Sequence, residues 1–591
     1  ERLETAPYRG IFGDAASSGL SVAGGGYSID GGPKGAFVVR NPSRNSAPML
    51  RATFQTAAKV VDRARLYVTA RGVYEVFLNG HRVSEDRLNP GLTQYNVTHL
   101  YQTYDVTSLV KSGRNALGAM LAEGWWSGLL SYGSVWNHFG DRQSLLAKLE
   151  VTYKDGSSDI VTTNGRDWKY FGQGPVRYAS LDFGEIYDAS READVEGWST
   201  QAYDDRKWKP AKVTPLEGTA FSGTEAGGFG PPAPPFQWNK LSLVGQIGDN
   251  AGIFRTLRAK SVKEVRPGVF VYDLGQNIVG APRIRIANGS PGARMTVRYA
   301  EMLYPNLKES GANAGMIMTE NYRAALSTDV YTMKAGPQTF EPRFTSHGFQ
   351  YVEITGIEKA PPLEAVEGVV VSSVRELTAE YRTSNAKVNQ LWSNLVWSNI
   401  DNFLTIPTDC PQRNERMGWS GDINVFSATA TYVSNADQFL TRHMRAMRDV
   451  QSPAGRFTDV APVGGGFGGV LWGSAGIVVP WEAYRQYKDV TLLEQHYPAM
   501  TAYLDYLEST VDPKTGLTSD AQLGDWLGPQ NNALGSAYLA AAYHAYDLAI
   551  MAKAAAVLGK HADAARYVAL YEKRRAAFNS TFVNADHQTM G

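Results

Sequence analysis

The sequence has almost no cysteine, since Cys410 is the single one among 591 residues. One cysteine excludes an intrachain disulfide framework. No histidine lies between Asp409 and Asp422 to activate this thiol. We therefore expect Cys410 to be a small buried thiol and not a nucleophile.

The chain also lacks a net charge and long apolar runs. Lysine plus arginine and aspartate plus glutamate each number 58, so no long-range field favours nucleic acid or an anionic membrane as a partner. No run of about 18 apolar residues is present, and we expect no membrane-spanning segment.

The first residue, Glu1, does not open a signal peptide. The compartment stays open, with the periplasm or secretion slightly favoured over the cytoplasm, and so does the oligomeric state.

Aromatic residues and glycine are, in contrast, abundant. Aromatics make up 11% of the chain, with 13 Trp and 31 Tyr, and glycine numbers 59. This mixture suits β-sandwiches and flat surfaces on which sugar rings stack. It favours carbohydrate as the ligand class, although large β-rich proteins also carry many aromatics in their cores.

From about residue 50 to 375 the sequence alternates between polar and apolar residues in short runs. Examples are Ala64 to Ala70, Tyr74 to Leu78 before the turn Asn79-Gly80, and Ala281 to Ile286 before Asn288-Gly289. A period of two residues with such turns predicts antiparallel strands joined by hairpins. We interpret this part as several β-sandwiches.

After about Asn385 the apolar residues recur every three to four positions, which predicts amphipathic helices. The helical runs are Val388 to Leu404, Ile423 to Met447, Glu482 to Tyr506 and Ala537 to Leu570. Consecutive helical hairpins indicate an α/α barrel. Gly464 to Gly469 would form a loop at the barrel mouth where backbone passes close to a ligand, or else a flexible linker.

The predicted fold class is therefore multidomain β plus α. Several N-terminal antiparallel β-sandwich domains precede an (α/α)6 barrel, and the switch from strands to helices falls between Ser373 and Ser384. The Pro231 to Pro235 segment reads as a linker between β-domains. The expected domains are residues 1–235, including a possible carbohydrate-binding module, 236–375, and the catalytic domain 376–591.

The stretch from Asp409 to Asp422 reads DCPQRNERMGWSGD. It combines carboxylates, arginines and a tryptophan with almost no aliphatic residues. Such a composition is unsuited to a hydrophobic core. Cleavage of a glycosidic bond needs a carboxylic acid that protonates the leaving oxygen, and neighbouring carboxylates raise the pKa of such an acid. The alternative is a solvated loop whose charges pair at the surface. Pro411, which interrupts regular structure, and the Gly-Trp pair at Trp419 favour a bent and tightly packed segment over a solvated loop.

This stretch closely resembles the signature of the inverting α-L-rhamnosidase family of glycoside hydrolases, with Asn414 at a position where Asp is common. Further blocks that are similar to family members occur in the same order from roughly residue 50 to the end. They are YEVFLNG from Tyr74, YQTYDVT from Tyr101, EGWWSG from Glu123, GEIYDAS from Gly184, YDLGQNIVG from Tyr272 and FTSHGFQYVEITG from Phe344.

Carried over position by position, the resemblance implies that Glu415 is the general acid. The sugar pocket would be lined by Asp409, Arg413, Trp419 and Asp422. Trp472 and Trp526 look like family pocket walls, and an aromatic wall suits the methyl group of a deoxysugar. Relatives often carry Asp where this chain has Ser474, so one carboxylate contact is expected to be absent.

An inverting mechanism also needs a second carboxylate, about 6.5–9.5 Å from the acid, to activate water. Family members place that base beyond the position of Gly591, and we expect the rest of the barrel and a C-terminal β-domain to lie outside this chain. Glu482 and Asp525 are candidate substitutes for this base, although neither matches the family's base position.

The implied activity is release of terminal α-L-rhamnose with inversion. A rhamnose-binding relative or fragment without hydrolysis, and an α/α-barrel exo-glycosidase for another sugar, stay open.

No cofactor is expected for catalysis. In this family the β-domain with blocks like EGWWSG can bind rhamnose, in some members through calcium, which takes six to eight oxygen ligands. Acids near these blocks are Asp141, Asp182, Glu185 and Asp188. They are candidate calcium ligands, or they serve turns.

Overall fold

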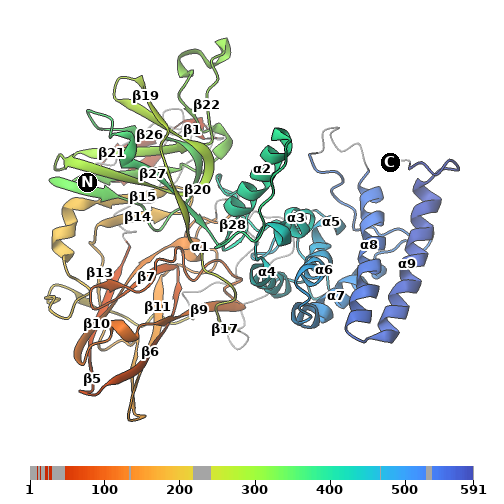
Figure 1. The fold of residues 1–591 in the computed structure, drawn as a ribbon, viewed down its shortest axis with the longest axis horizontal. Coiled ribbons are helices and arrows are strands. Elements are labelled where there is room, and N and C mark those ends of the chain that lie inside the picture. Colours follow the sequence, from red (N-terminus) through yellow and green to blue (C-terminus); the bar gives the residue numbers. More distant parts are fainter. Residues whose placement is uncertain are drawn as a thin grey trace.

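The computed structural model describes residues 47–589 except 132, 134, 217–240, 466–467 and 528–534, together with four short N-terminal strands. β-sheets form one half of the molecule and helices the other (Figure 1). The expected linker from Pro231 to Pro235 lies outside the described residues.

Four small sheets of the described chain have two strands each. They pair β1 (Arg9–Gly10) with β2 (Gly13–Asp14), β3 (Leu20–Ala23) with β4 (Gly26–Ile29), β22 (Met302–Leu303) with β23 (Ile317–Met318), and β28 (Phe403–Leu404) with β29 (Ile406–Pro407).

Two N-terminal sheets share one hydrophobic core. The first has the strand order β16-β13-β5-β10-β7-β8 and the second the order β12-β11-β6-β9-β17. The buried residues of β6, Ala64, Leu66, Val68 and Ala70, alternate with outward ones, as a half-buried strand requires. The strands are β5 (Met49–Thr56), β6 (Val61–Arg71), β7 (Val73–Leu78), β8 (His81–Arg82), β9 (Thr98–Asp105), β10 (Gly113–Ala122), β11 (Ser144–Tyr153), β12 (Ser158–Thr162), β13 (Lys169–Phe171), β16 (Lys209–Pro210) and β17 (Ser242–Gly245).

A larger sheet follows, with the order β14-β15-β24-β21-β26-β20-β27-β18 and with β19 and β25 paired to β20. Its apolar face packs against the first long helix through Val396 and Ile400. The strands are β14 (Val176–Ser180), β15 (Gly184–Asp188), β18 (Gly252–Arg258), β19 (Ser261–Arg266), β20 (Val269–Gly289), β21 (Arg294–Ala300), β24 (Thr328–Thr332), β25 (Gly336–Phe340), β26 (His347–Thr355) and β27 (Val366–Ser372).

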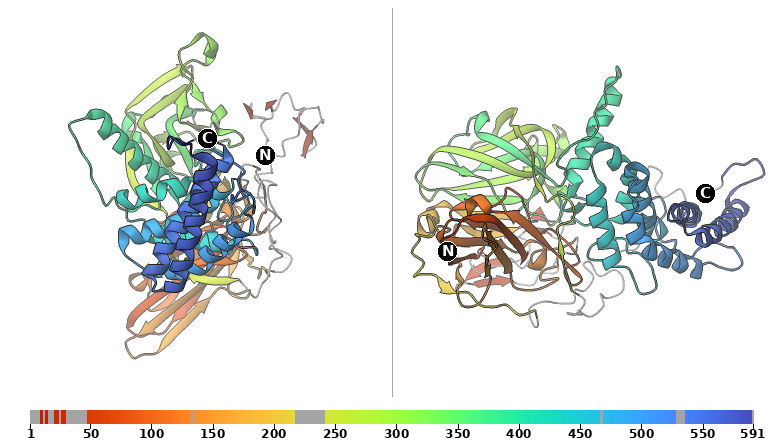
Figure 2. Two further views of the ribbon diagram at one scale, coloured as in Figure 1. Left: turned by 90° about the vertical axis from the view of Figure 1, so that its right-hand side faces the viewer. Right: turned by 60° about the horizontal axis from the view of Figure 1, so that its bottom comes forward.

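After β27 the described chain is predominantly helical. A separate core lies among these helices, and α8 and α9 lie side by side at the far end (Figure 2). The helices are α1 (Gly124–Ser127), which belongs to the β-rich part, then α2 (Ala386–Asn402), α3 (Ser420–Val433), α4 (Asp437–Asp449), α5 (Val470–Gly473), α6 (Ala475–Tyr487), α7 (Thr491–Ser509), α8 (Ser536–Val557) and α9 (His561–Phe582). A β-rich N-terminal part followed by a helical part is thus confirmed.

Some predicted boundaries were wrong. The run from Glu482 to Tyr506 is split between α6 and α7, because Lys488 ends α6 in the left-handed conformation, with φ of 61°. Ile423 to Met447 and Ala537 to Leu570 likewise each span two helices. Amphipathic periodicity continues across such short breaks, so it does not reveal them.

The two predicted turns had different outcomes. Asn79 and Gly80 both have positive φ, 52° and 89°, as the tight turn between β7 and β8 requires. The turn expected at Asn288-Gly289 was misplaced: β20 continues through Gly289, and Ala293 N donates to Ser290 O in the turn that follows.

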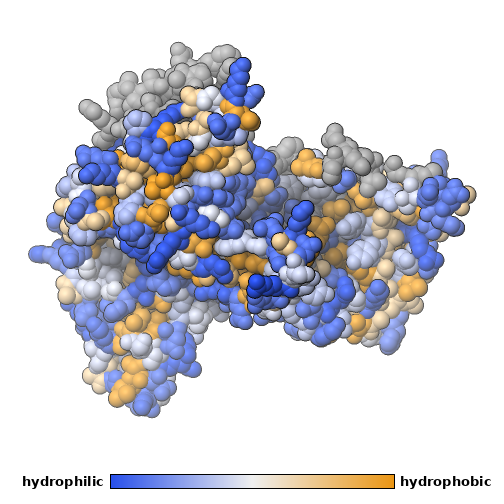
Figure 3. Space-filling model, turned by 45° about the horizontal axis from the view of Figure 1, so that its top comes forward, coloured by the Kyte–Doolittle hydropathy of each residue, from blue (hydrophilic) through white to orange (hydrophobic). Residues whose placement is uncertain are grey.

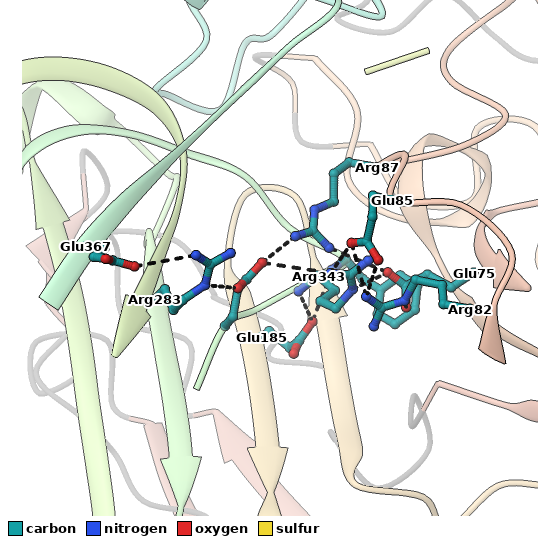
Figure 4. Close-up of polar contacts among 10 residues, drawn as sticks. Glu75, Arg82, Glu85, Arg87, Glu185, Arg283, Arg343 and Glu367 are labelled. Carbon is teal, nitrogen blue, oxygen red and sulfur yellow. Dashed lines mark hydrogen bonds and ion pairs between the residues drawn. The ribbon is translucent and has the colours of Figure 1, made fainter. Parts of the chain in front are cut away.

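Buried ion pairs join the N-terminal sheets to the large sheet (Figure 4). Glu75 on β7 pairs with Arg343, and Arg87 pairs with Glu341, which also accepts from Arg283 at 2.5 Å. Burial raises the pKa of Glu75 to about 7, although neighbouring arginines oppose the shift. Opposite charges thus face one another across the junction between the two β parts.

The surface shows no dominant apolar face in the view of Figure 3, where hydrophilic residues predominate and hydrophobic ones form scattered patches. Within the described segments, none of the helices combines the length and the apolar character needed to cross a lipid bilayer.

Candidate active site

The loop from Asp409 to Trp419 connects β29 to α3 and forms the centre of the candidate site. Its ends are held together because Asp409 N donates to Met417 O at 2.8 Å and Met417 N to Asp409 O at 3.1 Å. Residues 410–416, which lie between Asp409 and Met417, therefore form a closed loop. Trp419 bridges to Val460, and α3 begins one residue later at Ser420.

The seven residues predicted to form the acid and the sugar pocket all line a single cavity of about 600 Å³. This volume lies within the range of small-molecule sites, about 300–1,000 Å³. The loop and the first turn of α3 supply five of them, α5 supplies one, and the segment before residue 528 supplies the last. The lining residues are Arg323, Asp409, Cys410, Arg413, Glu415, Trp419, Asp422, Trp472, Leu523, Trp526 and Leu527.

Glu415 is held by donors on both carboxylate oxygens. Trp419 Nε1 donates to Oε1 at 2.8 Å, while Arg323 Nη1 donates to Oε2 at 2.8 Å. Arg413 Nε lies 3.1 Å from the same Oε2 as an ion pair. The side chain is only 9% exposed, so these contacts fix its orientation at the cavity wall.

Asp422 stands in the first turn of α3 and faces the same cavity. It is accessible to solvent, yet the concave wall excludes part of the bulk water. This desolvation, followed by repulsion from Asp409 and Glu415, raises the pKa of Asp422 to about 7. The carboxyl group therefore changes charge near neutral pH, which the sequence analysis expected of the acid itself.

Cys410 lies at the cavity wall and is only partly buried, so the prediction of a buried thiol was too strong. Its Sγ donates to Asp409 Oδ1 at 2.7 Å. Burial and the adjacent carboxylate of Asp409 raise the pKa of Cys410 far above its ordinary value. A neutral thiol is a poor nucleophile, in agreement with the prediction that Cys410 does not attack substrate.

Trp472 forms a buried wall because two glycines leave it room. A Cβ atom on Gly421 would lie 2.7 Å from Trp472 Nε1, and one on Gly468 would lie 2.2 Å from Cδ2. The glycine-rich loop thus passes close to this indole. Trp526 is 51% exposed and Leu527 78% exposed, and with Leu523 they line the cavity as a second apolar group.

Arg323 and the two leucines were missed by the sequence analysis. Arg323 precedes Glu415 by 92 positions and follows a short helix in the β-rich part, so no local pattern connects them. Leu523 and Leu527 flank the block with Trp526, and their apolar character beside that tryptophan was the available signal.

Other candidates lie outside the described cavity wall. Glu482 pairs with Arg485 at 2.9 Å on α6, and Asp525 is not among the lining residues. Ser474 is fully buried, and its hydroxyl donates to Asp547 Oδ2 at 2.5 Å. Asn414, within the loop, is buried and is not among the lining residues.

The four candidate calcium ligands each have a protein partner. Asp141 pairs with Arg142, Asp182 with Arg416, and Asp188 with Arg191, while Glu185 accepts from two backbone N–H groups at 3.1 Å. Among the residues that the structure describes, no three His, Cys, Asp or Glu side chains are grouped so as to hold a metal ion. Calcium binding stays a prediction.

Arg416 attaches the loop to the β-rich part. Its guanidinium donates to the carbonyl oxygens of Leu181 and Ser346, at 2.5 and 2.8 Å, and lies 3.3 Å from Asp182 Oδ1. Burial raises the pKa of Asp182 to about 6 against the opposing effect of Arg416. The position of the loop thus depends on the sheets as well as on the helices.

Three family models match successive parts of the chain. They are described as the α-L-rhamnosidase N-terminal domain, over residues 59–227, the bacterial α-L-rhamnosidase concanavalin-like domain, over 263–372, and the bacterial α-L-rhamnosidase 6 hairpin glycosidase domain, over 376–591. The cavity residues come chiefly from the third match, and Arg323 comes from the second.

Similar proteins carry the same description. The chain is 42% identical to an α-L-rhamnosidase of Streptomyces avermitilis over 93% of its own length and 50% of the relative. It is 35% identical to an α-L-rhamnosidase of Formosa agariphila over 90% of its length and 55% of the relative. The chain thus spans about half the length of the curated relatives it matches.

Solved structures agree with this comparison. The crystal structure of the Streptomyces avermitilis α-L-rhamnosidase complexed with L-rhamnose has a TM-score of 0.82 and 40% identity, covering 92% of this chain and 49% of that one. The native α-L-rhamnosidase of Aspergillus terreus has a TM-score of 0.82 and 30% identity, covering 92% and 60%.

Proposed function

Because this chain belongs to the bacterial α-L-rhamnosidase family, we propose that it is part of an inverting glycoside hydrolase that releases terminal non-reducing α-L-rhamnose. The observation that carries the proposal is the single cavity lined by all seven residues that were predicted to form the acid and the sugar pocket. The substrates in view are rhamnosides and polysaccharide-derived oligosaccharides, with no nucleic acid or membrane partner. Secretion or the periplasm stays slightly favoured.

Glu415 is proposed as the general acid. Its O–H bond breaks as the proton passes to the glycosidic oxygen, and the bond from that oxygen to the anomeric carbon breaks with its electron pair left on oxygen. The oxygen of a water molecule forms the new bond to the anomeric carbon from the opposite face, and the proton of this water passes to a general base. Asp409, Arg413 and Asp422 supply charged hydrogen-bonding groups for the sugar hydroxyls, and Trp419 holds the acid by its indole N–H. Trp472 and Trp526 offer apolar surface to the ring and its methyl group.

The finer architecture belongs to the same proposal. It places β-sandwich domains within 1–235 and 236–375, and part of an (α/α)6 barrel in residues 376–591. Strands cross the boundary at residue 235, since β14 and β15 belong to the large sheet and β17 pairs with β9 in an N-terminal sheet. Catalysis needs no cofactor in this proposal.

The test is hydrolysis of 4-nitrophenyl α-L-rhamnoside by the protein that carries this chain, with the product followed by proton NMR. We expect the first rhamnose released to be the β-anomer, because water attacks the face opposite the leaving group. An α-anomer released first would overturn inversion. Saturable rhamnose binding without any turnover would favour the binding-only alternative, and turnover of only other terminal sugars would favour a different exo-glycosidase.

A further inference from the structure

Arg323 reaches the proposed acid from a part of the chain outside the helical region. It follows the short helix Glu320–Tyr322, and its Nη1 donates to Glu415 Oε2 at 2.8 Å. Its side chain is 34% exposed, whereas that of Glu415 is 9% exposed. The cation is therefore placed at the edge of the cavity with one face toward the carboxylate.

The segment that carries Arg323 is anchored to the large sheet. Tyr322 is fully buried, and its hydroxyl donates to Gly348 O at 2.5 Å. Asn321 Nδ2 donates to Glu301 Oε2 at 3.0 Å. Because both preceding side chains are fixed, the guanidinium is presented from a rigid base, as a group that positions a reacting atom requires.

The contacts distinguish the two oxygens of Glu415. An ionised carboxylate has about four lone-pair sites. Oε2 faces the guanidinium groups of Arg323 and Arg413, while Oε1 accepts one bond, from Trp419. A proton on Oε2 would point toward the N–H donors of the two arginines, which is unfavourable. Oε1 accepts the bond from Trp419 and keeps a second lone pair to which the proton can bind.

Charges of both signs surround Glu415. The guanidinium groups of Arg323 and Arg413 contact its Oε2, and the carboxyl groups of Asp409 and Asp422 line the same cavity. Cys410 contributes no charge, since its thiol stays neutral. Removal of Arg323 would leave Oε2 with the guanidinium of Arg413 alone.

We propose that Arg323 is a positioning residue for the proton donor: by occupying Oε2 of Glu415 it makes Oε1 the oxygen that carries and delivers the proton. After transfer, Glu415 is left as a carboxylate and the Arg323 cation stabilises the charge on Oε2. The proposal rests on the proposed function, since it assigns the acid's reactive oxygen.

The kinetic test compares two leaving groups in Arg323→Met and Arg323→Lys. A 4-nitrophenyl rhamnoside needs little protonation, whereas methyl α-L-rhamnoside depends fully on the acid. Because general acid catalysis contributes about 10²–10⁴-fold, we expect kcat/KM of Arg323→Met to fall about tenfold further for the methyl glycoside. Arg323→Lys should recover part of the difference. An equal loss on both substrates would overturn the proposal.

A second readout does not depend on turnover. The indole N–H of Trp419 donates to Oε1, so its NMR signal, identified with Trp419→Phe, reports the placement of that oxygen. We expect this signal to move in Arg323→Met, because Glu415 is then no longer held through Oε2 by Arg323, and to stay in place in Arg575→Met, a control on α9. An unchanged signal in Arg323→Met would refute the assignment. If no rhamnoside is hydrolysed at all, the proposed function fails while this spectrum still decides whether Arg323 positions Glu415.

Discussion

The carboxyl groups at the cavity differ in role because their neighbours differ. Glu415 is fixed by an indole and two guanidinium groups, whereas Asp422 stands opposite two other carboxylates. An acid that protonates a leaving group needs a fixed orientation, which these three contacts give to Glu415. Asp422 instead changes charge near neutral pH within the same cavity.

Asp422 should make stability depend on pH. Its folded-state pKa of about 7 lies above the ordinary 3.8, so the folded protein binds this proton more tightly than the unfolded chain does. The stability it contributes is present below about pH 4 and is lost as the pH rises through about 7. We expect Asp422→Asn to match the wild type in Tm near pH 4 and to exceed it near pH 8. A lower Tm of the variant at the higher pH would contradict this electrostatic account.

Residue types and spacing allowed the seven cavity residues to be predicted, because most lie in one short stretch with an unusual mixture of acids, arginines and tryptophan. Arg323 could not be predicted, since only the packing of the large sheet against the loop brings it to Glu415. The charge state of Asp422 also depends on spatial neighbours and on cavity shape, neither of which is visible in the order of residues.

At the scale of elements, strands and helices were predictable from their periods, whereas the breaks between helices were not. Alternation along β6 reflects one buried face, and Asn79-Gly80 marks a turn that needs positive φ. The break after Tyr487 depends on the single residue Lys488, which leaves the hydrophobic pattern intact.

One ion pair connects the loop before α3 to the turn between β14 and β15, in addition to the bonds from Arg416 to two backbone carbonyls. Removing one partner of a buried pair costs about 3–5 kcal/mol, because the other charge stays buried. We therefore expect Asp182→Ala to lower the free energy of unfolding by about this amount and to reduce hydrolysis, since Arg416 then loses its partner. Denaturant unfolding measures the effect.

Two companion variants make that measurement specific. Asp182→Asn keeps the shape of the side chain and should lose less stability. Asp194→Ala removes an exposed carboxylate from the same region and should change little. Equal unfolding free energies for Asp182→Ala and Asp194→Ala would show that the pair does not hold the loop.

At the scale of the whole molecule, the candidate site is shared between the β-rich and helical parts. Arg323 and Asp182 come from the sheets, while the cavity loop and Trp472 come from the helical region. The ion pairs around Glu75 and Glu341 join the sheets to one another (Figure 4). The β-rich part is thus a structural component of the proposed site as well as its neighbour.

The most direct measurement of the central claim is the rate of rhamnoside hydrolysis by Glu415→Gln, which keeps the shape of the side chain but has no proton to deliver. In the protein that carries this chain, we expect kcat on methyl α-L-rhamnoside to fall by about 10²–10⁴-fold. Glu494→Gln, an exposed substitution on α7, should keep the wild-type rate. A Glu415→Gln rate within twofold of the wild type would contradict the assignment of Glu415 as the acid.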